Sequence, residues 1–563
     1  MTNINAKLSC IDTFSENYRS DFIFSRTMST TNVSEGLADE FKSWWHGRPV
    51  FIDAPTGSGK SSWVINNLLA YVMETGGQML IVSNRIAINT QYKQLILRAV
   101  APSLIKKYTD FGLQETNQFE GIPVVFSSYQ GLPGLLKHGV SFTYAVFDEV
   151  HFFCSDSGFS RDTWALLKQL PKTFVNAVRI YMTATPWSVQ NLVAKAEEEY
   201  KLPIGERIIL TSGGVIFFPG MLMYRFPSLP RNYKLRMLPS EVRDNACSKT
   251  LLDLIKNSPS TEKWIVFVNS KEIGKKLAKS LGGIAAYLDA EHKSGPVWGE
   301  LTTKAKFSAR VLVTTAVTDC GVNINDPAVK HVVLSSTDHV QFMQELGRKR
   351  LKEGETLNVY VPDLSPQQWR KLNAKNEQLI QLVDDVSQHP ERRCTQRFSL
   401  WYDGDREARC LITIDGNGNL QINLCAKQVV YQRALFYQEL EDQWASGEKH
   451  PFLRIVARWL ELPESALADA LEGNSEAAFR HFLNENCGRP LEGEEAQRIF
   501  SNKFRELYTA AFGPRETGSR RKDPWGAGII QTELDRQEIP YELTAQKGVW
   551  LLTKKEEEVS SNV

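Results

Sequence analysis

Residues 54–61 read Ala-Pro-Thr-Gly-Ser-Gly-Lys-Ser, an order that suits a phosphate-binding loop. The loop follows an apolar run at 50–52 and precedes a segment of helical character from residue 63, the context such a loop requires. Glycine at 57 and 59 lets backbone N–H groups close around a phosphate, because a Cβ there would hold the chain away. We expect nucleotide contacts from Pro55, Thr56, Gly57, Ser58, Gly59, Lys60, Ser61 and Ser62.

Two further groups would complete the chemistry of nucleotide hydrolysis. Lys60 would reach the β- and γ-phosphates of ATP, and the Ser61 hydroxyl would ligate Mg²⁺. Downstream, Asp148-Glu149-Val150-His151 follows the apolar run 144–147, which is typical of a buried parallel strand. At the carboxyl end of that strand, Asp148 can hold Mg²⁺ through water and Glu149 can accept a proton from the attacking water. A flexible glycine turn at 54–61 and a solvated acidic turn at 148–151 are the alternatives. Both are disfavoured because the two motifs occur in this order in one chain.

With these two features the chain resembles a superfamily 2 helicase or translocase of the DExH group. In that family Lys60 and Ser61 belong to motif I, residues 148–151 to motif II, and Thr183-Ala184-Thr185-Pro186 to motif III. Weaker matches to the remaining motifs occur in order at 80–87, 125–132, 264–270, 311–324 and 344–350. The resemblance implies two RecA-like domains, ATP and Mg²⁺ as cofactors, and a nucleic-acid track.

The stretch Gln344-Glu345-Leu346-Gly347-Arg348-Lys349-Arg350 resembles motif VI, which brings guanidinium groups from the second domain onto the γ-phosphate. By itself the stretch would fit a basic, solvated helix face. Arg350 is one residue closer to Arg348 than common family patterns place the second arginine, so which one is the arginine finger stays open. A short Q-x-x-G-R-x-R form is similar to that of some phage and mobile-element helicases, and it favours DNA over RNA, with a single strand as the track.

The resemblance assigns roles to individual residues. Catalysis would involve Glu149, Lys60, Arg348, Arg350, Gln344 and His151, with Gly321 at the nucleotide and Ser61 and Asp148 at the metal. Nucleic-acid contact, or its coupling to hydrolysis, would involve Asn84, Arg85, Ser127, Ser128, Thr183, Thr185, Ser270, Thr314 and Thr315. For the phosphate-contacting members of this second group, ordinary loop hydrogen bonding is an equal alternative. Asn323 stands where many relatives carry Asp, which keeps an acceptor but removes a charge. Nothing upstream of Phe51 resembles an adenine-reading glutamine motif, and His151 argues for the DExH side, so we expect other NTPs to be tolerated.

Composition sets outer limits on function. The 563 residues carry a net charge of +1, so a nucleic-acid site would be a local groove rather than a global positive field. The eight cysteines form no C-x-x-C pair that would indicate a zinc or iron–sulfur site. No run of 18 or more apolar residues and no leader-like N-terminus is present, so we expect no membrane span and a cytoplasmic location.

Alternating apolar runs and helical segments predict an α/β fold of two tandem RecA-like parallel-sheet domains. We expect a lead-in at 1–36, the first domain at 37–225, the second at 226–363, and an accessory region at 364–563. The prolines at 219, 227 and 230 indicate the interdomain connection. The accessory region should be mostly helical, with a β-hairpin at 411–423 and a helix and hairpin at 529–552 resembling a winged-helix fragment.

The leading hypothesis is an NTP-dependent nucleic-acid helicase or translocase. The alternative is a nucleotide-gated clamp or remodelling ATPase that separates no strands, and no residue in the sequence distinguishes the two. A transporter ATPase or small-molecule kinase lacks support, because motifs IV to VI would then have no explanation.

Overall fold

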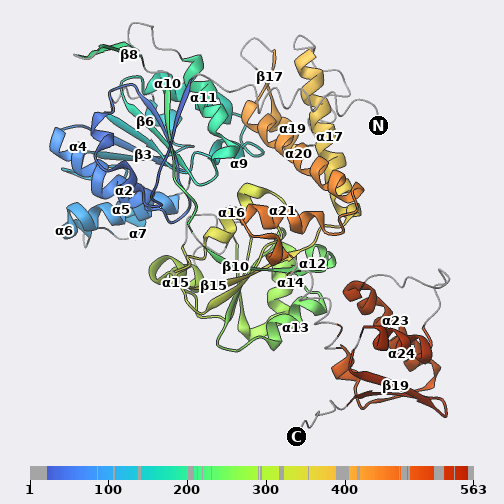
Figure 1. Ribbon diagram of the computed structural model, residues 1–563. Helices are drawn as coiled ribbons and strands as arrows, with labels where there is room; N and C mark the ends of the chain where they lie inside the picture. The colour runs from blue at the N-terminus through green and yellow to red at the C-terminus, as the bar shows by residue number, and fades with distance from the viewer. Residues whose placement is uncertain are drawn as a thin grey trace.

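The structure, a computed structural model, has two parallel-sheet α/β domains followed by a mostly helical region that contains small antiparallel sheets (Figure 1). It describes residues 22–555 except 85, 106–107, 109, 137–140, 201–207, 212–213, 218–219, 230, 290, 292–294, 316–322, 353, 389–404, 415–418, 468–469, 471–478, 480–481, 513–524 and 538. The predicted fold class, two tandem RecA-like domains with a helical C-terminal region and a hairpin, is confirmed. Among the helices described, none is both long and apolar enough to cross a lipid bilayer.

The first domain contains a seven-stranded parallel sheet in the order β1-β9-β2-β6-β5-β3-β4. Its strands are β1 (Ile23–Thr27), β2 (Pro49–Asp53), β3 (Met79–Ser83), β4 (Val124–Ser128), β5 (Tyr144–Phe147), β6 (Val178–Thr183) and β9 (Met221–Arg225). A short antiparallel pair, β7 (Ile208–Thr211) and β8 (Gly214–Phe217), precedes β9. The helices are α2 (Val33–Leu37), η1 (Glu40–Ser43), α3 (Lys60–Trp63), η2 (Val64–Leu68), α4 (Leu69–Thr75), α5 (Ile86–Val100), α6 (Pro102–Ile105), α7 (Asp110–Glu115), α8 (Leu132–Leu136), α9 (Phe152–Ser155), α10 (Thr163–Thr173), η3 (Pro186–Ser188) and α11 (Gln190–Glu199).

Both faces of this sheet are buried, as a parallel sheet requires. On β2, Val50 and Ile52 pack with residues of α3, α4 and α5, whereas Phe51 packs with residues of α9, α10 and α11 on the opposite face. Because β2, β6 and β5 are neighbours, the loops that follow their carboxyl ends lie together. The phosphate-binding loop, Thr183 and Asp148 follow or end those three strands.

Two segments differ from the domain organisation that we expected. The range 1–36 was expected to be a peripheral lead-in, but β1 pairs in parallel with β9, and α2 buries Val33 and Leu37 in the core of the first domain. The lead-in prediction is therefore wrong for the described residues from 22 onward. β9 itself lies in the proline-containing stretch that we assigned to the interdomain connection, and it pairs with both β1 and β2.

The second domain contains a six-stranded parallel sheet in the order β10-β15-β14-β11-β13-β12. Its strands are β10 (Asn232–Leu238), β11 (Lys263–Phe267), β12 (Ala285–Leu288), β13 (Val311–Thr314), β14 (Val329–Val333) and β15 (Thr356–Pro362). Its helices are α12 (Glu241–Asp244), α13 (Lys249–Asn257), α14 (Lys271–Leu281), η5 (Gly282–Ile284), α15 (Pro296–Lys304) and α16 (His339–Gly347). α16 carries most of the predicted motif VI and follows the central strand β14.

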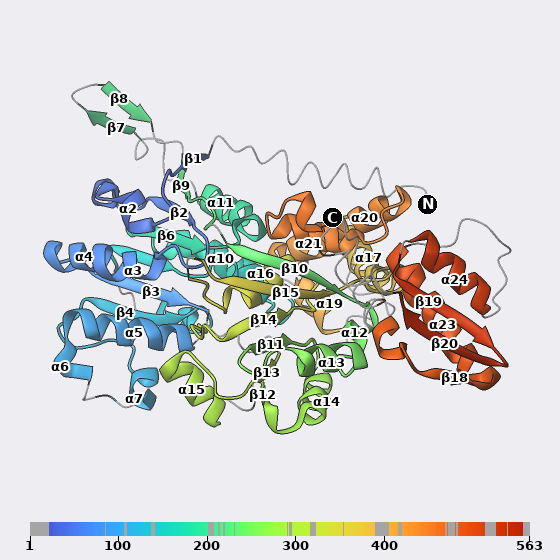
Figure 2. The same cartoon turned by 60° about the horizontal axis from the view of Figure 1, so that its bottom comes forward.

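The C-terminal region is less peripheral than an accessory region would be. It contains α17 (Pro366–Gln388), α19 (Arg406–Leu411), the hairpin β16 (Ile412–Ile414) and β17 (Leu420–Ile422), α20 (Leu424–Ala445) and α21 (Pro451–Trp459). Phe452, Leu453 and Val456 of α21 belong to the core of the second domain, and Cys425 of α20 belongs to a core cluster of the first. Figures 1 and 2 both show α21 beside α16.

The last part of the chain has a core of its own. β18 (Pro490–Glu492), α23 (Gly493–Phe512), α24 (Ala527–Arg536), β19 (Tyr541–Gln546) and β20 (Val549–Lys554) surround a cluster that includes Phe504, Tyr508 and Leu552. The antiparallel sheet has the order β18-β20-β19. The helix and hairpin predicted at 529–552 are therefore present, joined by a third strand.

Candidate nucleotide site

The phosphate-binding loop has the backbone conformation that its glycines predict. Gly57 and Gly59 have φ of 95° and 86°, in the left-handed region that side chains with a Cβ rarely adopt. Gly59 precedes Lys60, the first residue of α3, so the positive end of that helix faces the loop. Lys60 Nζ donates to the carbonyl oxygens of Ala54 at 2.6 Å and Pro55 at 3.2 Å. Burial lowers the pKa of Lys60, while Glu149 and Asp148 oppose that shift.

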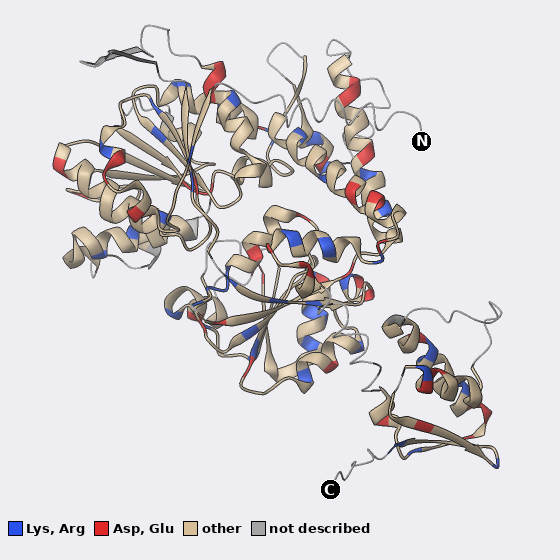
Figure 3. Ribbon diagram, in the orientation of Figure 1, with Lys and Arg blue, Asp and Glu red and all other residues tan. Residues whose placement is uncertain are grey.

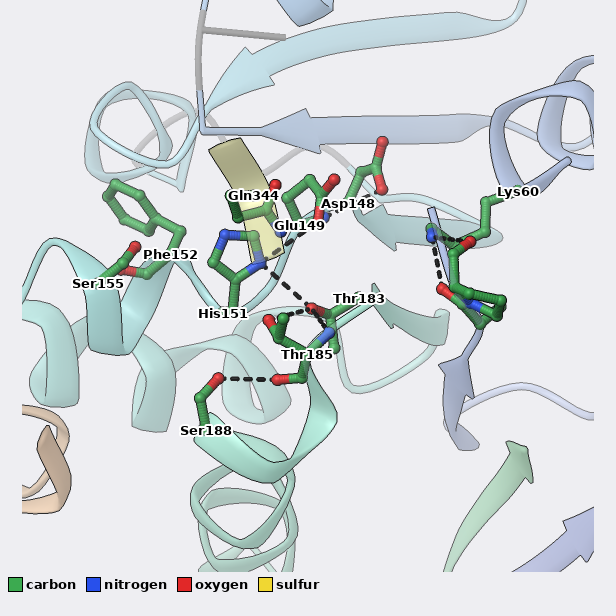
Figure 4. A network of polar contacts seen from close by, with 12 residues as sticks. Lys60, Asp148, Glu149, His151, Phe152, Ser155, Thr183, Thr185, Ser188 and Gln344 are labelled. Carbon is green, nitrogen blue, oxygen red and sulfur yellow. Dashed lines mark hydrogen bonds and ion pairs between the residues drawn. The ribbon is translucent and has the colours of Figure 1, made fainter. Parts of the chain in front are cut away.

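The predicted acidic pair lies at the carboxyl end of β5, facing this loop (Figure 4). Asp148 Oδ2 accepts a hydrogen bond from Tyr92 Oη at 2.8 Å, and Asp148 Oδ1 accepts one from the Glu149 N–H at 3.0 Å. Burial and the neighbouring Glu149 raise the pKa of Asp148, and Lys60 opposes the shift. Burial would also raise the pKa of Glu149, but His151, Lys60 and Arg348 together lower it. Glu149 is therefore held in its ionised form.

Tyr92 is a site residue that sequence reasoning missed. It lies on α5, is buried, and its hydroxyl contacts both predicted metal ligands, Asp148 directly and Ser61 on α3. Burial and Asp148 raise the pKa of Tyr92 well above its usual value, so the hydroxyl stays protonated and donates. No motif in the sequence marks Tyr92, because it is a single aromatic residue within an amphipathic helix.

A chain of polar contacts, an ion pair followed by hydrogen bonds, leads from Glu149 to motif III (Figure 4). His151 Nδ1 lies 3.3 Å from Glu149 Oε2 and 3.1 Å from Thr183 Oγ1. Thr183 Oγ1 lies 3.3 Å from Thr185 Oγ1 and accepts from the Thr185 N–H at 3.0 Å. The carbonyl of Thr185 accepts from Ser188 Oγ at 2.8 Å. Both threonines are buried, and Thr183 contacts motif II through His151.

Three arginines of the second domain gather at the other side of the site. Arg348 Nη2 donates to Gln344 Oε1 at 3.0 Å, one helical turn earlier, and Arg350 Nε donates to Asn323 Oδ1 at 2.8 Å. The carbonyl acceptor that Asn323 offers in place of a carboxylate is therefore used. Arg231, which precedes β10, donates through Nη2 to the Thr56 carbonyl at 2.5 Å. Burial, then Arg348 and Arg231, lower the pKa of Arg350 to about 10.

Arg231 was missed because it directly follows the connection between the domains, where the sequence shows prolines and no motif. Its contact with Thr56 means that the second domain reaches the tip of the phosphate-binding loop. Gly347 lies against the same residue, since a Cβ at that position would be in ordinary van der Waals contact with Thr56 Cγ2, at 3.4 Å. The loop tip is thus held closely between Gly347 and Arg231.

The N-terminal segment before β2 also contacts the loop. The Val33 N–H donates to the Ser58 carbonyl at 2.9 Å, and Asn32 accepts from the Ser34 and Glu35 N–H groups as the N-cap of α2. A Cβ at Gly59 would lie 3.6 Å from Asn32 Nδ2. The sequence shows no adenine-reading glutamine motif in this segment. It also gave no sign that the segment packs on the loop.

The residues of the site fit Mg²⁺-ATP. Within the described part of the chain, Arg348 Nε and Ser58 Oγ are buried and have no hydrogen-bond partner, so both are available to an anion. Lys60, Arg231, Arg348 and Arg350 bring positive charge to the site, and Glu149, Asp148 and Asp53 offset part of it. Ser61 and Asp148 would hold the metal, with Tyr92 between them.

Two cavities lie near the site, and one of them adjoins the loop. One of about 800 Å³ is lined by loop residues Thr56 and Gly57 and by basic residues of the second domain, among them Arg231, Lys349 and Arg350. A second, of about 580 Å³, is lined by Glu149, Gln344 and Arg348 together with residues of the C-terminal region such as Lys375 and Arg433. Glu149 and Arg348, from different domains, therefore face one space.

The predicted nucleic-acid residues are at the carboxyl ends of strands in both sheets. Asn84 follows β3, Ser127 and Ser128 end β4, Ser270 follows β11, and Thr314 ends β13. Several of their hydroxyls are used locally, since Ser128 Oγ accepts from the Gly131 N–H and Ser270 Oγ accepts from the Glu272 N–H. Thr314 Oγ1 donates to the Thr315 carbonyl. Arg85 and Gly321 lie outside the described residues, and phosphate contact by this group stays a prediction.

Comparison with known proteins gives a family match within the first domain and similarities to solved structures. Residues 27–188 match the family model described as Type III restriction enzyme, res subunit. Among solved structures the chain is similar to S. cerevisiae Dbp5 bound to RNA and ADP BeF3, with 14% identity and a TM-score of 0.42 over 59% of this chain and 83% of that one. It is also similar to a fragment described as an HsdR subunit of a type I restriction enzyme from Vibrio vulnificus, with 18% identity and a TM-score of 0.38 over 58% of this chain and 61% of that one. No curated protein matches the chain.

The family match contains the phosphate-binding loop, the acidic motif and motif III. The match therefore covers the part of the first domain that carries the predicted nucleotide-binding residues.

Proposed function

We propose that the protein is a DExH-type helicase or translocase that couples ATP hydrolysis to movement on nucleic acid, with single-stranded DNA favoured over RNA as the track. The observation that carries the proposal is that Glu149 of the first domain and Arg348 of the second face one cavity. Hydrolysis therefore depends on the relative position of two domains, which is how a motor converts turnover into movement.

Each residue has a defined task in this proposal. Bound Mg²⁺-ATP supplies the phosphoryl group and the metal charge that offsets its oxygens. Lys60 and the loop N–H groups bind the phosphates, and Glu149 orients a water and accepts its proton. Arg348, held by Gln344, meets the charge that develops on the γ-phosphate.

The charge distribution supports a track held by local contacts. Figure 3 shows Lys and Arg interspersed with Asp and Glu over both domains and over α17 and α20. With charges of both signs mixed in this way, we expect backbone N–H and hydroxyl groups to make part of the phosphate contacts. The carboxyl ends of β3, β4, β11 and β13 supply such groups on both domains.

The test is ATP turnover measured alone and with single-stranded DNA, duplex DNA and RNA, with Lys60→Ala as the inactive control. We expect stimulation by at least one nucleic acid, greatest with single-stranded DNA. Turnover with no stimulation by any of them would favour a nucleotide-gated clamp, and stimulation by RNA alone would contradict the preference for DNA. Strand separation is then measured on a tailed duplex.

A further inference from the structure

Three aromatic rings from three parts of the chain form one stack at the start of α16. The His339 ring lies between Trp187 of η3, with centroids 4.4 Å apart and planes 19° apart, and Trp459 of α21, with centroids 4.5 Å apart and planes 7° apart. Trp187 follows motif III in the first domain, His339 begins the motif VI helix, and Trp459 ends a C-terminal helix. No predicted motif includes any of the three.

The stack is held on both sides. The Trp187 carbonyl accepts from Gln432 Nε2 of α20 at 3.1 Å, so the C-terminal region is also hydrogen-bonded to the backbone of η3. Trp459 packs edge-on against Phe342 of α16, with centroids 5.4 Å apart. Burial lowers the pKa of His339 to about 4, so its ring is neutral and stacks without a charge to solvate.

The stack is also connected to the nucleotide site through both domains. From Glu149, contacts run through His151, Thr183 and Thr185 to η3, which bears Trp187. From His339, α16 runs to Gln344 and Arg348, which face Glu149 again. A shift of the ring stack would therefore move the arginine and the base relative to each other.

We propose that the stack of Trp187, His339 and Trp459 is a positioning device, which fixes the start of α16 against the first domain and thereby places Arg348 opposite Glu149. The C-terminal region, through Trp459, then controls how often the site reaches the geometry for hydrolysis. This inference rests on the proposed ATPase function, but it adds residues that contact neither nucleotide nor metal.

The primary test is Trp187→Ala, because Trp187 is 38% exposed and its removal leaves the cores intact. We expect kcat for ATP to fall about tenfold, with the Kd of a fluorescent ATP analogue and the melting temperature nearly unchanged. Trp187→Phe, which keeps a flat ring, should restore most of the turnover. Trp444→Ala is the matched control, since Trp444 is equally exposed at 38% but packs on Trp369 outside the stack.

A second variant tests the same device from the other end. Trp459→Ala should lower kcat in the same way, and the double variant with Trp187→Ala should be little worse than either single one, because both act through His339. If Trp459→Ala lowers the melting temperature, Trp459→Phe and His339→Phe replace it, and both should keep turnover close to wild type.

The outcomes separate the two proposals. A wild-type chain that hydrolyses no ATP overturns both. If the wild type is active and Trp187→Ala turns over at the wild-type rate, the positioning role alone is wrong. Equal losses in nucleotide affinity and kcat, or strictly additive losses in the double variant, would also overturn it, because they indicate a general structural effect.

Discussion

The backbone of Glu149, the proposed catalytic base, leads to a prediction: at this position glycine should be more stabilising than alanine. Glu149 has φ of 51°, in the left-handed region where a Cβ crowds the following carbonyl. Elsewhere a glycine destabilises relative to alanine, by roughly 0.5–1 kcal/mol. At position 149 alanine would carry the left-handed penalty of roughly 1–2 kcal/mol, which outweighs the cost of the flexible glycine. We therefore expect Glu149→Gly to be more stable than Glu149→Ala by about 1 kcal/mol.

Both variants lack the carboxylate, so the comparison isolates the backbone. In a domain of this size the difference corresponds to roughly 2–4 °C in melting temperature, measurable by scanning calorimetry. The control is the same pair of substitutions at Lys275, an exposed residue inside α14, where alanine should be the more stable. Equal stability at 149, or a more stable alanine, would refute the argument that the base is held in a strained conformation.

The activity of the same pair tests the chemistry. Both should lose at least about 10²–10⁴-fold in kcat, as expected for removal of a general base. Glu149→Gln keeps the shape of the side chain and should trap bound ATP. Turnover that survives in Glu149→Gly would show that another group accepts the proton, whatever the stability result.

Three further predictions concern other groups. Arg348→Ala should lower kcat by about 10³-fold or more with ATP binding retained, whereas Arg350→Ala, which lies nearer the loop, should weaken binding as well; the reverse pattern in kcat and nucleotide titration would exchange their roles. Burial raises the pKa of Asp53 to about 6, so the folded chain takes up a proton more readily than the unfolded one and loses stability as pH rises from about 4 to 6. Asp53→Asn removes this loss, and its gain in melting temperature should be larger at pH 7.5 than at pH 4; an equal gain at both values would contradict the shift. Arg179 and Glu197 form a buried ion pair at 2.7 Å, so Glu197→Ala should lower the unfolding free energy in urea by about 3–5 kcal/mol, and a loss near zero would contradict that account.

The sequence was informative where chemistry is local. The loop at 54–61 and the pair Asp148 and Glu149 could be recognised because each is short and follows a strand whose apolar run is visible. Arg348 and Gln344 were found for the same reason, since they lie one turn apart on a helix. Within each domain the parallel sheet brings the carboxyl ends of neighbouring strands together, and this places the loop beside Asp148 and Glu149.

What the sequence could not show depends on partners far along the chain. β1 is a short run whose pairing strand begins at Met221, so its local pattern resembled a loose arm. Arg231 has no motif, and only the three-dimensional fold brings it to Thr56. The amphipathic pattern of α21 predicts a helix, but it does not say that its apolar face completes the core of the second domain.

The pairing of β9 with β1 and β2 has a consequence for how the protein is made. β2, which leads into the phosphate-binding loop, lies between β6 and β9, and both neighbours come more than roughly 120 residues later in the chain. A nascent chain emerging from the ribosome has the loop long before it has the strands that hold it in place. We therefore expect the loop to adopt its folded shape only after residue 225 has been synthesised. Incomplete chains shorter than this should neither bind ATP nor compete with the finished protein for it.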